Sequence, residues 1–233
     1  MTKDAVPEDP VNETRLNTRP GLIATAAALL LTGGISLWGW QNLPNDARIP
    51  MHWGISGEAD RFGGKTEALL TLPLIILGIG ALLAFSPRLA PRQQNTARSR
   101  HVYFAAWIGM LVLLTVLHAV SIINAAGGDL PMTRIIVALL GALFLVLGNY
   151  LPKSRSNWLA GVRTPWTLDS DLAWRRANRL AGFLFAGLGL VLLVTAFILP
   201  IPALFAVLLA GVVICSIGPT AYSWWTWRAE NGR

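Results

Sequence analysis

The chain has 233 residues, of which 54% are hydrophobic and 13% are charged, and its formal net charge is +7. A soluble domain carries roughly 25% charged residues, so this composition excludes a soluble globular enzyme, a disordered chain and a secreted disulfide scaffold. The single cysteine, Cys215, excludes an intramolecular disulfide and a cysteine metal cluster. The composition predicts an integral membrane protein.

Residues 1–20 contain four acids and three bases, with Pro, Asp, Asn and Thr prominent and no apolar repeat. This pattern predicts a short disordered cytoplasmic tail. The apolar run that follows is too long for the core of a signal peptide, so we expect it to remain as the first membrane span. After the tail we expect two units, 21–100 with two helices and 101–233 with four.

Six apolar stretches approach or reach the length of about 20 residues that a helix needs to cross a bilayer. They are Gly21–Trp40, Leu69–Phe85, Val102–Ile123, Ile135–Leu151, Leu180–Leu199 and Ile201–Trp224. Pro200 and Pro202 leave so short a turn that the last two spans must form an antiparallel hairpin. The predicted fold class is an all-α integral membrane protein with six transmembrane helices.

Glycines within the spans are expected to let helix backbones approach closely. They are Gly33, Gly34, Gly78, Gly80, Gly141, Gly182, Gly187, Gly189 and Gly211. His118 is the only ionisable group well inside a span. We expect it to form a hydrogen bond between helices.

Lysine and arginine predict the orientation, because short loops rich in these residues stay in the cytoplasm. With both termini cytoplasmic, the inner segments hold 15 of the 19 Lys and Arg residues and the outer segments hold 4. We therefore expect an ordered outer loop over 41–68 and a basic inner loop over 152–179.

The outer loop contains two prolines, Pro44 and Pro50, that exclude a helix through its first half. We expect a compact loop that buries five apolar side chains, those of Ile49, Met51, Trp53, Ile55 and Phe62. Aspartates paired with arginine or lysine should support its turns. His52 is its only histidine, and a zinc site wants three or four ligands, so we expect no metal ion here.

The outer loop resembles a bacterial membrane domain of unknown function whose hallmark is an Ile-Pro-x-His-Trp loop. The matching positions are Leu43, Pro44, Ile49, Pro50, His52, Trp53, Gly57, Asp60 and Lys65. The resemblance covers about residues 43–90. We take Pro50, His52, Trp53, Gly57, Asp60 and Lys65 as the candidate contact residues of this loop.

The inner loop is the densest polar stretch, with six cations and two acids alongside three tryptophans, Trp158, Trp166 and Trp174. Asp169 or Ser170 is expected to cap a helix that begins near Leu172. The composition predicts a segment on the inner membrane surface, which either anchors to lipid headgroups or docks a cytoplasmic protein. Direct nucleic acid binding is not expected, since no known binding module is present.

The inner loop and the helix after it resemble the SdpI family of bacterial immunity proteins. The matches are Gly148, Asn149, Tyr150, Pro152, Lys153, Asn157, Gly161, the run 163–168 (Arg-Thr-Pro-Trp-Thr-Leu), Ser170, Trp174, Arg179 and Gly182. The resemblance implies a multi-pass protein of the bacterial plasma membrane that protects against a secreted killing peptide and signals to a cytoplasmic repressor. Asn178 departs from the family, in which a His often stands there, and Asp171 replaces a frequent Glu.

The resemblance makes eight inner-loop residues candidate contacts for a ligand or partner. They are Asn149, Asn157, Arg163, Thr164, Pro165, Trp166, Trp174 and Arg179. Neither a cofactor nor a catalytic residue is expected. The partners implied are the lipid bilayer, a killing peptide outside and a repressor protein inside.

Three other functions stay open. A transporter of small or lipidic solutes is disfavoured because no Asp, Glu, Lys or Arg lies mid-span. It is favoured by Pro73 and Pro219 within apolar runs, since discontinuous helices often line transport sites. A membrane enzyme would have to use the outer-loop trio of His52, Ser56 and Asp60. The last alternative is a membrane protein without an assigned role.

Overall fold

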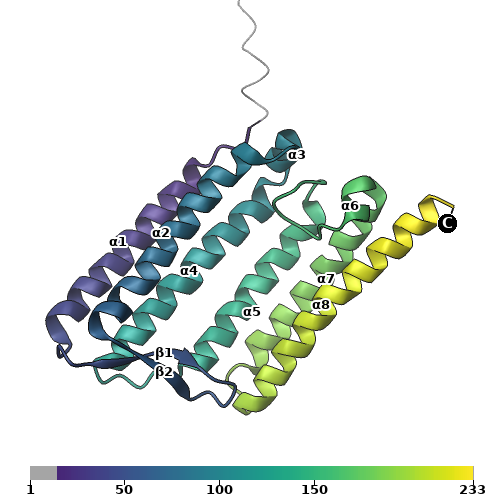
Figure 1. Cartoon of the computed structure of the whole chain (residues 1–233). Coiled ribbons are helices and arrows are strands. Elements are labelled where there is room, and N and C mark those ends of the chain that lie inside the picture. Colours follow the sequence, from purple (N-terminus) through teal and green to yellow (C-terminus); the bar gives the residue numbers. More distant parts are fainter. Residues whose placement is uncertain (1–14, 233) are drawn as a thin grey trace, which may run out of the picture.

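The computed structural model describes residues 15–232, and the first fourteen residues of the predicted tail lie outside it. Six long helices cross the molecule side by side (Figure 1). They are α1 (Arg19–Asn42), α2 (Lys65–Leu89), α4 (Arg100–Ala125), α5 (Met132–Tyr150), α7 (Asp171–Thr195) and α8 (Ile201–Glu230). Each is long and apolar enough to span a membrane, with α5 continuing through Lys153, which confirms the six predicted spans.

Short elements close the two ends of the helix array. Strands β1 (Arg48–Trp53) and β2 (Ala59–Gly64) pair as an antiparallel hairpin at one end. The short helices α3 (Gln93–Arg98), η2 (Leu151–Lys153) and α6 (Pro165–Asp169) lie at the other end, where both described ends of the chain also lie (Figure 1). The all-α prediction therefore missed a β-hairpin, which forms in the outer-loop segment that is rich in proline and glycine.

The long helices form two groups of three. Helices α1, α2 and α4 contact one another, as do α5, α7 and α8, and α4 meets α5 where the groups join. Trp107 lies fully buried in the first group, and Leu192 and Leu204 are fully buried in the second. Only five residues separate α7 from α8, which confirms the predicted antiparallel pair.

Glycine allows the closest backbone approach between α5 and α7. A Cβ atom added to Gly141 would lie 2.9 Å from the carbonyl oxygen of Gly189, and small residues of this kind let membrane helices pack tightly. The same role was predicted for Gly33, Gly34, Gly78 and Gly187. For these four glycines the prediction is wrong. A Cβ on any of these four meets nothing within 4 Å, because these glycines lie on faces that no other described helix covers.

Prolines do not interrupt the helices. Pro73 and Pro87 lie inside α2, and Pro219 lies inside α8. A proline lacks the N–H that would bond the carbonyl four residues earlier, which leaves the carbonyls of Leu69 and Leu83 free in α2. The Ser36 hydroxyl donates to Leu69 O at 2.7 Å, and the Tyr103 hydroxyl donates to Leu83 O.

These continuous helices remove the feature that favoured a transporter. The expected discontinuity at Pro73 and Pro219 is wrong, since both helices run through their prolines. In α2, side chains from α1 and α4 replace the missing backbone hydrogen bonds.

Candidate functional site

The hairpin rests on both helix groups. Ile49 of β1 is fully buried in a cluster with Leu43, Leu69 and Ile122, which belong to the first group or its loop. Ser121 of α4 donates to Pro50 O at 3.3 Å, and Thr133 of α5 donates to Gly57 O at 3.4 Å. The hairpin is therefore an ordered cap that spans the junction of α4 and α5.

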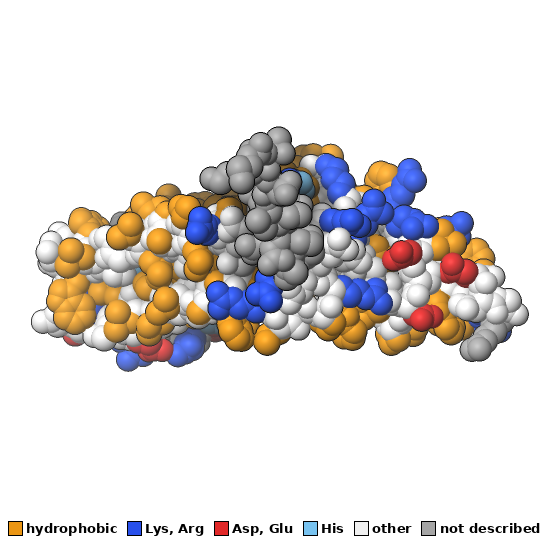
Figure 2. Space-filling model, turned by 90° about the horizontal axis from the view of Figure 1, so that it is seen from above, with side chains coloured by type: hydrophobic (Ala, Val, Ile, Leu, Met, Phe, Trp, Pro, Cys, Tyr) orange, Lys and Arg blue, Asp and Glu red, His pale blue; other side chains and the backbone are white. Residues whose placement is uncertain are grey.

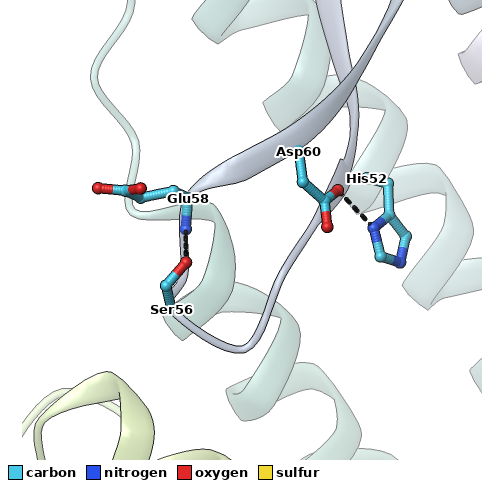
Figure 3. A network of polar contacts seen from close by, with 4 residues as sticks. All are labelled: His52, Ser56, Glu58 and Asp60. Carbon is cyan, nitrogen blue, oxygen red and sulfur yellow. Dashed lines mark hydrogen bonds and ion pairs between the residues drawn. The ribbon is translucent and has the colours of Figure 1, made fainter.

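The His52 and Asp60 side chains face each other across the hairpin (Figure 3). His52 Nδ1 lies 2.6 Å from Asp60 Oδ1, and both side chains are more than half exposed. Glu58 points away from this pair, and the Ser56 hydroxyl accepts a hydrogen bond from the Glu58 backbone N–H at 3.4 Å (Figure 3). Ser56 thus takes part in a turn and does not form a nucleophile–base pair with His52.

A metal site does not form among the described residues. Across 15–232, no three His, Cys, Asp or Glu side chains are grouped so that they could hold a metal ion. Two acids near the hairpin bond basic side chains instead, since Glu67 pairs with Arg61 at 2.5 Å and Asp60 is hydrogen-bonded to His52. The predicted pairing of aspartates with arginine or lysine in this loop is therefore wrong, since Asp60 pairs with His52 and it is Glu67 that pairs with an arginine.

Lys65 holds the two ends of the outer loop together. It is 7% exposed, and its Nζ donates to Leu43 O at 2.6 Å and to Asn45 Oδ1 at 3.3 Å. Its ammonium also lies 5.3 Å from the ring centre of Trp40. This buried cation ties the end of α1 to the start of α2, which is a structural role in the outer loop.

The hairpin carries exposed apolar side chains, Ile55 at its tip and Phe62 on β2. Ile55 is 74% exposed and Phe62 is 46% exposed, so the expectation that the loop buries them is wrong. Ile49 is buried against the helices, whereas no neighbouring element covers most of the Ile55 side chain in the turn at Gly54–Glu58. An exposed apolar residue cannot be told from a buried one by its type, which is why the sequence did not separate Ile55 from Ile49.

The inner loop folds around Asn157, whose side chain is fully buried. Its Nδ2 donates to Ser99 Oγ, Arg155 O and Ala160 O, at 3.2, 2.7 and 3.0 Å. Its Oδ1 accepts from the backbone N–H groups of Leu159 and Ala160, at 2.8 and 2.9 Å. Five hydrogen bonds on one amide fix the path of the loop and attach it to the start of α4.

The Thr-Pro-Trp run forms the helix α6. Thr164 caps it, with its hydroxyl accepting from the Thr167 N–H and its own N–H donating to Thr167 Oγ1. Pro165 follows at the first helical position, where a proline costs no hydrogen bond. The Trp166 indole N–H donates to Ser223 Oγ and thereby joins α6 to α8.

Trp174 and Asn178 lie inside the protein. Trp174 is 1% exposed and donates from Nε1 to Ser154 O at 3.1 Å, so its predicted place on the membrane surface is wrong. Asn178 is equally buried, and its Oδ1 accepts from the Val162 N–H at 2.9 Å. Ser170 caps α7 by accepting from the Ala173 N–H, which confirms one of the two predicted caps.

Four of the candidate inner-loop residues stay exposed to a partner, namely Asn149, Arg163, Pro165 and Arg179. Arg163 donates from Nη1 to Trp158 O at 2.7 Å, with its guanidinium on the surface. Arg179 lies 5.9 Å from the ring centre of Phe183, and Asn149 is exposed at the end of α5. The loop thus combines a buried polar framework with a surface of cations.

The sequence did not single out the residues that attach the inner loop to the first helix group. Arg92 donates to Ser156 Oγ at 2.6 Å and to Leu168 O at 2.8 Å. Asn95 donates to Ser156 O at 2.9 Å. Polar residues with short side chains just before a span, such as Asn95 and Ser99, could have indicated this contact. Such groups must find hydrogen-bond partners when they are buried.

Comparison with known proteins agrees with both family resemblances. Residues 153–223 match the SdpI/YfhL protein family, and residues 27–77 match the Domain of unknown function (DUF1648). The chain carries an SdpI/YfhL region. The chain is also similar to the immunity protein SdpI of Bacillus subtilis (strain 168), with 27% identity over 160 residues, 68% of this chain and 72% of that protein. No solved structure matches significantly.

The matched regions fall on the two sites described above. The SdpI/YfhL region contains the inner loop, α7 and most of α8, and the DUF1648 region contains the hairpin and parts of α1 and α2. Both predicted resemblances are confirmed. With its six spans, the chain is a multi-pass plasma membrane protein.

Proposed function

We propose that this chain is an immunity protein that protects a bacterial cell from a secreted killing peptide. The observation that carries the proposal is the similarity to the immunity protein SdpI, which extends over 68% of the chain. A non-catalytic mode of action agrees with the outer loop, where Ser56 bonds the Glu58 backbone and His52 pairs with Asp60. Protection would then result from binding the peptide in or at the bilayer.

The hairpin end is the proposed peptide-contact surface. Ile55 and Phe62 offer exposed apolar area, and the carboxylates of Glu58 and Asp60 lie on the same hairpin. Apolar area beside carboxylates suits an apolar or cationic peptide, since the two can be complementary in shape and charge. Among the predicted residues, His52 and Trp53 lie on this surface, whereas Pro50, Gly57 and Lys65 position the hairpin.

We place the end opposite the hairpin in the cytoplasm. Thirteen described Lys and Arg residues and three acids lie towards this end, against four basic and five acidic residues at the hairpin end. Figure 2 looks onto this end and shows basic side chains gathered over it. This distribution supports an extracellular hairpin through the preference of basic loops for the cytoplasm.

The exposed cations of the inner loop are the proposed docking surface for a cytoplasmic repressor. Arg163, Arg175 and Arg176 present guanidinium groups on this face, and Trp158 adds an apolar side chain that is 48% exposed. The proposed signalling to a repressor rests on the family resemblance. The hairpin and the inner loop each bridge the two helix groups, so movement between the groups would reach both.

Survival tests the immunity function. A sensitive bacterium expressing the chain is challenged with the cognate killing peptide of a family member, beside cells with an empty vector. We expect protection by the wild-type chain, partial loss with Ile55→Asp, and full protection with Arg48→Gln, an exposed charge change on the same hairpin. If the wild-type chain gives no protection at matched membrane abundance against any family peptide, the proposal is wrong.

A further inference from the structure

A cavity of about 870 Å³ lies between α4 and α5, along the junction of the two helix groups. The part of the cavity at the basic end of the molecule, called its mouth below, is lined by Arg15, Arg100 and His101. Deeper in, the lining is apolar and includes Phe104, Ile108 and Leu143. The cavity is therefore polar at one end and apolar along the rest of its length.

The dimensions of the cavity fit one acyl chain within a single leaflet. Its lining on α4 runs from Arg100 to Leu113, which is about 20 Å at the helical rise of 1.5 Å per residue. Half of the hydrocarbon core of a bilayer is about 15 Å thick. A chain lying against Ile108 and Val112 would thus remain at acyl depth while its headgroup stays near Arg100.

The mouth of the cavity is cationic. Arg15 and Arg100 line it, and among the described residues no Asp or Glu belongs to the lining. The three described acids of this end lie on α6, α7 and α8, where Asp169 accepts from Trp227 and Glu230 accepts from Ser170. His101, which lines the same end, stacks on Tyr150 at 5.9 Å between ring centres.

We propose that this cavity binds one anionic phospholipid, with its phosphate at Arg15 and Arg100 and an acyl chain along α4 and α5. Guanidinium groups bind phosphate oxygens in a two-pronged geometry, and basic pockets between membrane helices select acidic headgroups. The bound lipid fills the junction of the two helix groups. This proposal does not depend on the immunity function.

Native mass spectrometry of the full chain in detergent measures this binding with added phosphatidylglycerol or phosphatidylethanolamine. We expect one phosphatidylglycerol to bind in preference to phosphatidylethanolamine. Arg100→Gln should weaken phosphatidylglycerol binding about five-fold, the effect of about one arginine at an anionic surface. Val146→Trp, which places an indole across the apolar lining, should weaken the binding of both lipids.

Matched controls separate the cavity from general charge and hydrophobicity. Arg176→Gln removes an exposed cation of α7 that lies at the same basic end of the molecule as Arg100. Val213→Trp adds an indole to an exposed position of α8. Both should bind phosphatidylglycerol like the wild type, and circular dichroism should show all four variants folded. Equal effects of Arg100→Gln and Arg176→Gln, a lack of headgroup preference, or a dimer that Val146→Trp disrupts would each overturn the proposal.

Discussion

The Ser36 hydroxyl donates a hydrogen bond to the carbonyl that Pro73 leaves free, Leu69 O, at an O···O distance of 2.7 Å. Because Ser36 gives its own proton to Leu69, it accepts from His118 Nε2 at 2.9 Å, which fixes the proton of this histidine on Nε2. His118 Nδ1 has no hydrogen-bond partner among the described residues. The predicted role of His118 as a hydrogen-bonded group between helices is confirmed.

Ser36→Ala should lower the free energy of unfolding by about 1–3 kcal/mol, because it leaves a buried carbonyl without a partner. Thermal unfolding in detergent micelles measures the change. The control is Ser216→Ala, whose hydroxyl bonds the carbonyl of Val212 in its own helix and is exposed to the membrane side of α8. Equal midpoints for Ser36→Ala and the wild type would show that the α1–α2 contact does not depend on this bond.

Asn157→Ala should destabilise the inner loop, since it removes five hydrogen bonds around a fully buried amide. Leaving such groups unsatisfied costs on the order of 1–3 kcal/mol each, and limited proteolysis should cut the loop faster. Asn149→Ala is the matched control, because Asn149 is exposed and bonds only Lys153 among the described residues, at 3.4 Å. Identical proteolysis of the two variants would contradict the role given to Asn157.

The orientation can be tested with single cysteines. In a Cys215→Ala background, Ser56→Cys at the hairpin tip should react with a membrane-impermeant maleimide added to intact cells. Asp171→Cys at the start of α7 should react only after the membrane is permeabilised. Both positions are exposed, so access to solvent is matched. Labelling of Asp171→Cys in intact cells would reverse the proposed topology.

Arg163→Ala should reduce protection or signalling more than Arg175→Ala. Arg163 is held by its bond to Trp158 O within the folded loop, whereas Arg175 is an exposed cation with Arg176 and Arg179 as close neighbours that can replace it. The measurement is survival, with a repressor-release reporter, at matched membrane abundance. If the two variants behave alike, Arg163 has no special place on the docking surface.

Hydropathy alone was enough to predict the spans, because a bilayer demands long apolar helices whatever their neighbours are. Local chemistry also predicted the Ser170 cap. Burial within the loops could not be predicted, since it depends on contacts between distant segments. Trp174 was predicted to lie on the membrane surface, but its indole N–H donates to Ser154 O inside the protein. Ile55 was predicted to be buried, but its side chain is 74% exposed.

The two loops share a structural feature that cannot be read from the sequence. Each bridges the two helix groups through polar contacts to backbone, at Pro50 and Gly57 on the hairpin end and at Leu168 and Ser156 on the other. Because every residue has a backbone carbonyl, the sequence does not indicate which of them accept such bonds. The candidate residue Asn157 was found only through the family motif, and Ser99 and Ser223, which bond Asn157 and Trp166, were not predicted.

Direct binding of a killing peptide to the hairpin end is the most decisive measurement. The chain is reconstituted in nanodiscs, and the affinity for a labelled family peptide is determined for the wild type, Ile55→Asp and the control Arg48→Gln. We expect saturable binding that Ile55→Asp weakens at least about ten-fold, equivalent to ~1.4 kcal/mol, and that Arg48→Gln leaves unchanged. Binding of equal strength in all three proteins would contradict peptide capture at the hairpin.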